Sequence, residues 1–318
     1  MTDVVVVSRL FSGLIETLEE RHWRPAGVPA VAQLLVGLAE REDVSLTTIF
    51  TVKDQETAAH FSRFEAFDLP PIGRVYILPY CRLPGGWRSL ELIATELSQL
   101  VGCLLLWIKL RPFASYFTYA NLPIASFFAA FRWSRVSLRF MGIMPYHRRL
   151  ADGHRLRWID RINRRLLRVR FKNVVCTEDG SDPRALLPHL LHPAVPLTIK
   201  LNGVDRPKVQ TCEIARLREA LSPDGRPVIL YLGRMEPYKG CDEFVEAAKS
   251  ILRCHPDIAR FVLVGGGSRL DSIKEAIAAD GYEGDIRAVG TVASSDVPQY
   301  LQNTLIYVSL NMHGNLSN

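Results

Sequence analysis

The chain has 318 residues, 48% of them hydrophobic, and a formal net charge of +6. This length exceeds one ordinary domain, so we expect two hydrophobic cores. The six cysteines never form a Cys-x-x-Cys pair, which excludes a zinc knuckle and a disulfide framework and favours a reducing cytosol. We interpret the opening MTDVVVVSRL as a first strand and expect no signal peptide.

The first half alternates apolar strands with helices. The predicted strands are VVVVS, VSLTTIFTV, GRVYILPY, ASYFTYA, RVSLRFMG, NVVCTED and PLTIKLNG, and the helices include VPAVAQLLVGLAE, a Leu-rich stretch at about 90–110 and the segment from Leu122. Continuous apolar strands of this kind indicate a parallel sheet covered on both faces. We therefore expect residues 1–200 to form a doubly wound α/β domain.

Residues 112–131 are uncharged, and their length would allow a membrane span. Two prolines, an asparagine and several hydroxyls interrupt the stretch, which divides into a strand-like and a helix-like half. We expect a buried strand and helix here.

The alternation of predicted strands and helices is interrupted after residue 200. LNGVDRPKVQTCEIARLREALSPDGRP contains turn signals, so we place a boundary at 201–225. The pattern then restarts over 226–318 with the strands VILYLG, RFVLVG, IRAVG and LIYVSL and the helices CDEFVEAAKSILRCH, RLDSIKEAIAAD and SDVPQYLQN. We expect this second α/β domain to be partial.

The loop in LYLGRMEPYKG sets two cations between a strand and a helix. Ligands bind parallel sheets where strands end and helices begin, because helix N termini point unpaired N–H groups there. Gly233 lets the backbone turn toward a ligand, Arg234 can donate two hydrogen bonds to phosphate oxygens, and Lys239 adds a charge. These features suit a diphosphate. The alternative is a solvated loop whose cations pair with Glu236 or Asp242.

LVGGGSRL places Gly265, Gly266 and Gly267 after the next strand. A dinucleotide fingerprint requires Gly-x-Gly-x-x-Gly, but Leu270 stands at the third glycine, so nicotinamide binding is disfavoured. The glycines permit close approach of a nucleotide, and a plain tight turn is the alternative.

In this order and spacing, the second half resembles the retaining glycosyltransferases of family four. The segments that carry the resemblance are LNGVD, LYLGRMEPYKG with its trailing DEFVEAA, FVLVGGGSRL, AVGTV, DVPQYLQ and LIYVSL. It is specific from about Leu201 to the end and looser over 1–200. The resemblance implies the GT-B fold, in which two Rossmann-like doubly wound domains face a cleft, the second being incomplete here.

The resemblance also implies a reaction. A sugar would move from a UDP- or GDP-linked donor, with retention, to a polysaccharide precursor or lipid-linked sugar. Arg234 and Lys239 would grip the donor diphosphate and stabilise the charge on the leaving phosphate. The residues implied to bind the donor are Gly233, Gly265, Gly266, Gly267, Val289, Gly290, Asn315, Leu316 and Ser317. The sequence contains no Asp-x-Asp, which agrees with a reaction that needs neither metal nor cofactor.

Two departures from the family pattern matter, one at the end of the chain and one in the first domain. Gly314 stands where the family has the first Glu of a catalytic pair, and the second would lie beyond Asn318, so we expect a truncated chain that binds the donor poorly. Met141 stands where many relatives have a cleft histidine. His147 is a possible substitute on the acceptor side, with a surface histidine as the alternative. Gly27 matches a glycine-rich loop that faces the cleft, although a helix-start glycine explains it too.

A strongly basic segment closes the first half. HRLRWIDRINRRLLRVRFK has eight Lys/Arg and one acid. Helical spacing puts Ile159, Ile162, Leu166 and Val169 on one face, which we expect to pack on the sheet. The outward arginines would be Arg157, Arg161, Arg164, Arg165 and Arg168. We expect a cytoplasmic protein, peripheral on the inner membrane face, whose arginines meet anionic lipid. A solvated face is the alternative, and nucleic acid is disfavoured because stacking aromatics are missing.

Other function classes stay open at this point. Gly314 supports a catalytically silent GT-B binding protein. A nucleotide-sugar epimerase or phosphorylase could share the fold. An epimerase would need acidic or histidine residues in the first-domain cleft, where the sequence offers little beyond His147. A phosphorylase would need a pyridoxal-phosphate lysine in the region expected beyond Asn318.

Overall fold

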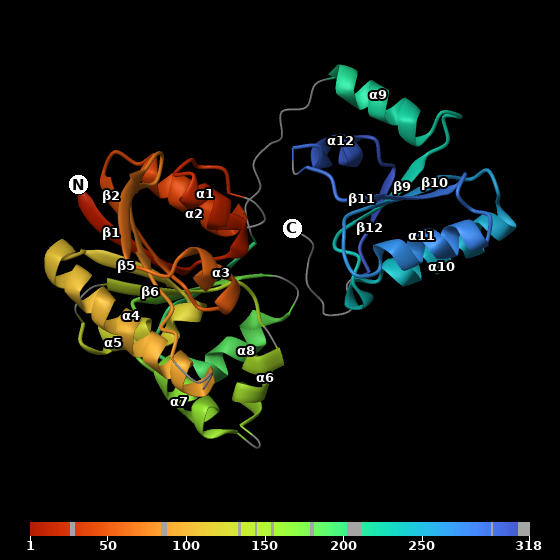
Figure 1. Cartoon of the computed structure of the whole chain (residues 1–318). Helices are drawn as coiled ribbons and strands as arrows, with labels where there is room; N and C mark the ends of the chain where they lie inside the picture. Colours follow the sequence, from red (N-terminus) through yellow and green to blue (C-terminus); the bar gives the residue numbers. More distant parts are fainter. Residues whose placement is uncertain are drawn as a thin grey trace. The chain divides into compact units, whose positions relative to one another are not determined.

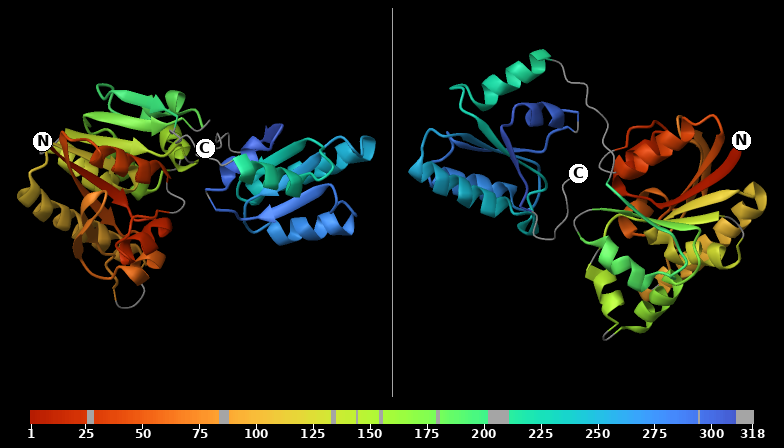
Figure 2. Two further views of the ribbon diagram at one scale, coloured as in Figure 1. Left: turned by 90° about the horizontal axis from the view of Figure 1, so that it is seen from above. Right: turned by 180° about the vertical axis from the view of Figure 1, so that it is seen from behind.

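The computed structural model divides into two compact units, Met1–Gly203 and Val204–Asn318 (Figure 1). The residues it describes are 1–25, 29–83, 88–132, 135–143, 145–153, 156–178, 181–201, 211–293 and 295–310. In each unit, helices cover both sides of a sheet (Figure 2). This agrees with the α/β architecture predicted for each half.

The sheet of the first unit has eight strands in the order β3-β4-β2-β1-β5-β6-β7-β8. They are β1 (Thr2–Arg9), β2 (Val44–Thr51), β3 (Glu65–Leu69), β4 (Gly73–Leu78), β5 (Ala114–Thr118), β6 (Arg135–Phe140), β7 (Asn173–Thr177) and β8 (Leu197–Lys200). All pairs are parallel except β3 with β4. Every strand predicted in this half is present, and β3 is the addition.

Alternate side chains of these strands enter two hydrophobic cores, one on each face. Val5 and Val7 of β1 belong to one core, while Val6 belongs to the other. One face is covered by α1 (Ile15–Glu19), α2 (Pro29–Ala39) and α3 (Gln55–His60). The other carries α4 (Arg88–Leu110), α5 (Leu122–Ala130), α6 (Pro145–Asp152), α7 (Trp158–Leu167) and α8 (Pro183–Leu190). The doubly wound prediction is confirmed.

The uncharged stretch 112–131 forms β5 and α5, as predicted. Ile124 and Phe128 of α5 are fully buried, and Trp107 of α4 stacks on Phe128 with ring centroids 4.2 Å apart. Among the described residues, α4 is instead the helix long and apolar enough to cross a membrane, by length and composition alone. Only 33% of its most apolar window is buried.

The basic segment forms α7, and the predicted apolar face is only half confirmed, because Leu166 and Val169 pack against the core while the other two residues do not. Ile159 and Ile162 are 42% and 40% exposed, whereas Asp160 is buried. The Asp160 carboxylate accepts a hydrogen bond from the Arg157 backbone N–H at 3.1 Å and lies 3.5 Å from an Arg149 nitrogen. This inward carboxylate fixes the rotation of the helix. The prediction that Ile159 and Ile162 pack on the sheet is therefore wrong.

The second unit has four parallel strands in the order β11-β10-β9-β12. They are β9 (Val228–Leu232), β10 (Arg260–Val264), β11 (Ile286–Gly290) and β12 (Ile306–Val308). One core lies under α10 (Cys241–Cys254) and α11 (Leu270–Ala279). The other face carries α12 (Val297–Gln302) and α9 (Thr211–Leu221). The segment interpreted as a boundary thus contains the helix α9. Asn303, which follows α12, donates a 3.0 Å hydrogen bond to Ile214 O of α9 and so joins the two helices.

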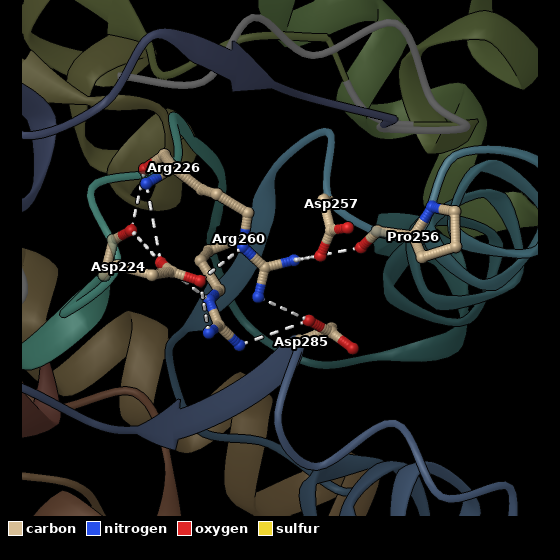
Figure 3. Close-up of polar contacts among 7 residues, drawn as sticks. Asp224, Arg226, Pro256, Asp257, Arg260 and Asp285 are labelled. Carbon is tan, nitrogen blue, oxygen red and sulfur yellow. Dashed lines mark hydrogen bonds and ion pairs between the residues drawn. The ribbon is translucent and has the colours of Figure 1, made fainter.

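An ion-pair network ties together the amino ends of β9, β10 and β11 (Figure 3). Arg226 donates to Asp224 at 2.6 Å and to Asp285 at 2.7 Å. Arg260 donates to the same two carboxylates at 2.7 and 3.2 Å. Each carboxylate is thus shared by two guanidinium groups, and the charges balance. The network stabilises the sheet at its amino edge.

We expect Asp285→Asn to lower the free energy of unfolding by roughly 1–3 kcal/mol, because two partly buried guanidinium groups lose a charged acceptor. Asp257→Asn is the matched control, since Asp257 is 97% exposed and lies 3.8 Å from Arg226. Urea unfolding of both variants measures the difference. Equal losses would mean that the network contributes nothing beyond a surface ion pair.

His147 lies in the core of the first unit rather than on its surface. Its side chain is 3% exposed. The rings of Tyr119, Phe140 and Tyr146 lie 4.6, 5.4 and 5.8 Å from it, centroid to centroid. The surface alternative is therefore wrong, because α6 turns this residue toward aromatic side chains. Burial lowers the pKa of His147 to about 4, so the imidazole is neutral at pH 7.

We expect this burial to make the first unit sensitive to acid. Between the unfolded pKa of 6.5 and the folded value of about 4, the unfolded chain binds the proton that the folded chain refuses. Stability should therefore fall as the pH falls through this window, by up to about 3 kcal/mol. Denaturant unfolding from pH 7 to 4 should show a steeper loss for the native chain than for His147→Gln. Parallel curves would contradict the assignment.

Candidate functional site

Three loops meet at the carboxyl edge of the second sheet. The loop after β9 starts at Gly233, and its Met235 N–H donates to Gly266 O at 2.8 Å. The turn after β10 is also joined to β11, because Gly265 N–H donates a hydrogen bond to Gly290 O at 2.8 Å. The structure therefore brings together the glycines that the sequence singled out at three separate strand ends.

The glycine-rich turn lies directly on the backbone of the loop after β9. Gly265 and Gly267 have φ of 139° and 149°, a region that L side chains rarely adopt. A Cβ on Gly265 would meet Gly233 O, and one on Gly267 would meet Met235 O. These two glycines are required because the turn packs against the neighbouring loop.

The loop after β9 is held at both ends by one side chain. The buried Tyr231 hydroxyl lies within hydrogen-bonding distance of two backbone carbonyl oxygens, 3.1 Å from that of Arg234 and 3.2 Å from that of Lys239. Between them, Pro237–Lys239 forms a short 3₁₀ turn. The backbone that carries both cations is thereby fixed.

The carboxylates close to this loop are engaged with other groups. Glu236 accepts hydrogen bonds from Ser268 N at 3.2 Å and Ser268 Oγ at 2.7 Å. Asp242 pairs with Arg269 at 2.8 Å. The alternative in which these two acids pair with the loop cations is therefore wrong.

The two cations share one aromatic neighbour. Arg234 Nη2 donates to the Tyr238 hydroxyl at 2.9 Å, and Lys239 Nζ lies 5.5 Å from the Tyr238 ring centroid. Neither cation has an ion pair among the residues that the structure describes. Burial, and secondly the positive charge of Arg234, lower the pKa of Lys239. An anion between the two cations would relieve this repulsion.

The helix that follows adds to the positive potential. α10 starts directly after Gly240, whose φ is 75°. A Cβ there would contact Leu310, so glycine is required at this junction. The unpaired N–H groups of the first turn and the helix dipole favour an anion at this end. The loop and helix together can bind a phosphate group.

The remaining predicted positions fall in different places. Val289 is partly buried in β11 and packs against a hydrophobic core, and Gly290 ends that strand. His147 lies in the other unit. Five positions lie outside the described residues, namely Gly27, Gly314, Asn315, Leu316 and Ser317. Over the part of the chain that the structure describes, no group of three or more His, Cys, Asp or Glu could hold a metal ion.

Sequence reasoning missed Arg9, the last residue of β1. The strand order of the first sheet reverses at β1, which pairs with β2 on one side and β5 on the other. Parallel sheets bind ligands at such a point. Arg9 Nη2 pairs with Asp54 at 2.9 Å, and Asp54 also accepts from Thr57 N–H at 2.9 Å to cap α3. A cation that ends an apolar strand, as in VVVVSR, was the available signal.

Known proteins match both the sequence and the fold. Residues 214–314 match the family model described as Glycosyl transferases group 1. The chain is 31% identical over 87 residues to the alpha-D-kanosaminyltransferase of Streptomyces kanamyceticus, a match that covers 27% of this chain and 22% of the relative. It is 30% identical over 154 residues to the GDP-mannose-dependent alpha-(1-6)-phosphatidylinositol monomannoside mannosyltransferase of Mycobacterium tuberculosis, covering 47% and 40%.

The crystal structure of HepE from Anabaena, in complex with UDP and glucose, resembles the fold of the whole chain. It matches with a TM-score of 0.60 at 15% identity, over 96% of this chain and 74% of HepE. The matched segments span less than half the length of the two curated relatives. The chain thus has the GT-B fold, and its residues 214–314 match the Glycosyl transferases group 1 family.

Proposed function

We propose that the chain is part of a retaining glycosyltransferase whose donor diphosphate binds between Arg234 and Lys239. One observation carries the proposal: two cations that form no ion pair with any described residue lie on one loop beside a helix N terminus, while Glu236 and Asp242 are engaged with Ser268 and Arg269. Such an arrangement favours a dianion at the carboxyl edge. The glycines at 233, 265–267 and 290, with Val289, would line the donor.

The chemistry requires stabilisation of a leaving phosphate. The bond from the anomeric carbon to the diphosphate oxygen breaks as the acceptor oxygen forms its bond on the same face. The acceptor proton passes to the departing phosphate oxygen. Arg234 and Lys239 would stabilise the negative charge on that phosphate, so the reaction needs neither metal nor cofactor.

The comparisons support the substrate classes without naming a single donor. HepE is in complex with UDP and glucose, and the mycobacterial relative is GDP-mannose-dependent. That relative is named for a phosphatidylinositol monomannoside, which supports a lipid-linked acceptor, and a polysaccharide precursor is the other acceptor proposed. A lipid-linked acceptor would place the protein on the cytoplasmic membrane face. The arginines of α7 favour such a surface, with Arg157, Arg161, Arg165 and Arg168 exposed and Arg164 partly buried.

Calorimetric titration with UDP and GDP tests the proposal. We expect one nucleotide to bind, and Arg234→Ala or Lys239→Ala to weaken binding by about tenfold to a hundredfold, the range for hydrogen bonds to charged groups. Lys274→Ala, an exposed lysine on α11 of the same unit, is the matched control and should bind like the native chain. Chelator should change nothing.

Two outcomes would contradict the assignment. Nucleotide binding that survives both substitutions would mean that the diphosphate lies elsewhere. If both variants lost their folded structure to the same extent, as seen by circular dichroism, the two cations would have a structural role in the unit rather than a role in nucleotide binding. If the nucleotide binds as expected, an assay for turnover of the nucleotide-sugar donor distinguishes a transferase from a catalytically silent binding protein.

Tyr231→Phe tests whether the loop must be held in place. The substitution removes the hydroxyl near the Arg234 and Lys239 carbonyls and keeps the buried ring. We expect nucleotide affinity to fall several-fold, by roughly the 1 kcal/mol of a neutral hydrogen bond. Tyr300→Phe, on the other face of the sheet, is the control. Unchanged affinity in Tyr231→Phe would show that the loop keeps its conformation without this contact.

A further inference from the structure

Helix α4 turns an apolar surface away from its own domain. Six aliphatic side chains recur every three or four residues and so share one face of the helix. They are Leu90, Ile93, Leu97, Val101, Leu105 and Ile108, which we call the α4 stripe. Each is between 44% and 66% exposed. The stripe runs along about 27 Å of helix, which is larger than scattered surface leucines would produce.

The opposite face of α4 packs on the sheet through Cys103, Leu106 and Trp107, and polar contacts fix its position. Gln99 Nε2 donates to Val52 O at 2.8 Å, and Thr95 Oγ1 accepts from Cys81 N–H at 3.0 Å. Because polar groups hold the inner face, the outward direction of the stripe is set by the fold.

The acids of the helix also point inward. Glu96 pairs with the largely buried Lys53 at 2.6 Å. The buried Glu91 accepts a hydrogen bond from the Leu83 N–H at 3.1 Å. Between Leu90 and Ile108 these are the charged residues of the helix, so the outward arc carries no charge.

A cationic hollow lies at the C-terminal end of the stripe. Ile108 and Arg111 line one hollow with Pro112, and Pro112 also lines the next. That second hollow, of about 470 Å³, is lined by four exposed cations, Arg132, Arg135, Arg170 and Lys172. No carboxylate is among the described residues that line it. Residues 97–151 contain seven Lys/Arg and no Asp or Glu.

We propose that the first unit docks on an anionic lipid bilayer through α4. The stripe enters the boundary between headgroups and acyl chains, and the cationic hollow binds lipid phosphates. Contacts place α5 beside both α4 and α7, and Trp158 of α7 is exposed among its arginines. This inference extends the membrane contact proposed for α7 to a second element, and it does not depend on sugar transfer.

A bilayer fits this surface better than a second copy of the chain. A symmetric pair would need carboxylates opposite the hollow, but residues 97–151 contain none, and Glu91 and Glu96 face inward. A bilayer with anionic lipid supplies apolar interior and phosphate charge together. A full span is disfavoured, because Gln99 and Thr95 would lose their partners in hydrocarbon.

Flotation with lipid vesicles tests the proposal. At physiological ionic strength, the native chain should float with vesicles of phosphatidylcholine and phosphatidylglycerol, and weakly with phosphatidylcholine alone. Leu97→Glu and Leu105→Glu should each reduce the bound fraction by about tenfold or more, because a carboxylate cannot enter the acyl boundary. Ile258→Glu is the matched control in the other unit, where the native side chain is 48% exposed.

A second pair of variants tests the charged part and does not rely on the stripe. Arg132→Gln with Arg170→Gln should reduce binding to the anionic vesicles and flatten its salt dependence. Unchanged flotation of the stripe variants would overturn the proposal. So would a native chain that ignores both vesicle types and forms, by sedimentation, a dimer that Leu97→Glu dissociates. Nucleotide binding should be unaffected in every variant, which separates this result from the donor site.

Discussion

The candidate site depends on the direct packing of two backbone loops. Met235 N–H donates a hydrogen bond to Gly266 O, which joins the cation-bearing loop to the turn after β10. Gly265 and Gly267 allow this close approach because a side chain at either position would meet the backbone of the loop. That turn also supplies Ser268 and Arg269, which engage Glu236 and Asp242. The packing of these neighbouring loops therefore both positions the backbone that carries the two cations and engages Glu236 and Asp242 with residues of the adjacent turn.

Charged side chains are paired at one edge of the second sheet and left without opposite charges from described ion pairs at the other. At the amino edge, two arginines and two aspartates neutralise one another within a closed network. At the carboxyl edge, burial and, secondly, the nearby charge of Arg234 lower the pKa of Lys239. A fold gains little stability from such an uncompensated pair, so its presence beside a helix N terminus favours a ligand role.

Helix α4 of the first unit is apolar on its exposed face as well as on its buried one. A helix on the surface of a soluble domain normally buries its apolar face and exposes its polar face. α4 buries Cys103, Leu106 and Trp107 but leaves the stripe exposed. Its inner face also carries Gln99, Thr95 and Glu96, which contact polar groups of the sheet and its loops. The apolar surface left outside, next to a cationic hollow without described carboxylates, is the feature that points to lipid.

Much of this architecture could be predicted because it depends on local pattern. The apolar strands, the glycine after VILYL and the cations of GRMEPYKG are consecutive in the chain, and their period and order indicate a parallel sheet with an anion site at a strand end. The sequence by itself thus determined the α/β class and the donor-loop candidate. Contacts between distant residues decided the rest. Lys53 and Glu96, 43 residues apart, help to fix which face of an all-round apolar helix turns inward. The buried Asp160 sets which face of α7 turns inward, aromatic rings surround His147, and Arg269 forms an ion pair with Asp242. These contacts join residues whose pairing cannot be predicted from the spacing of apolar residues along the chain.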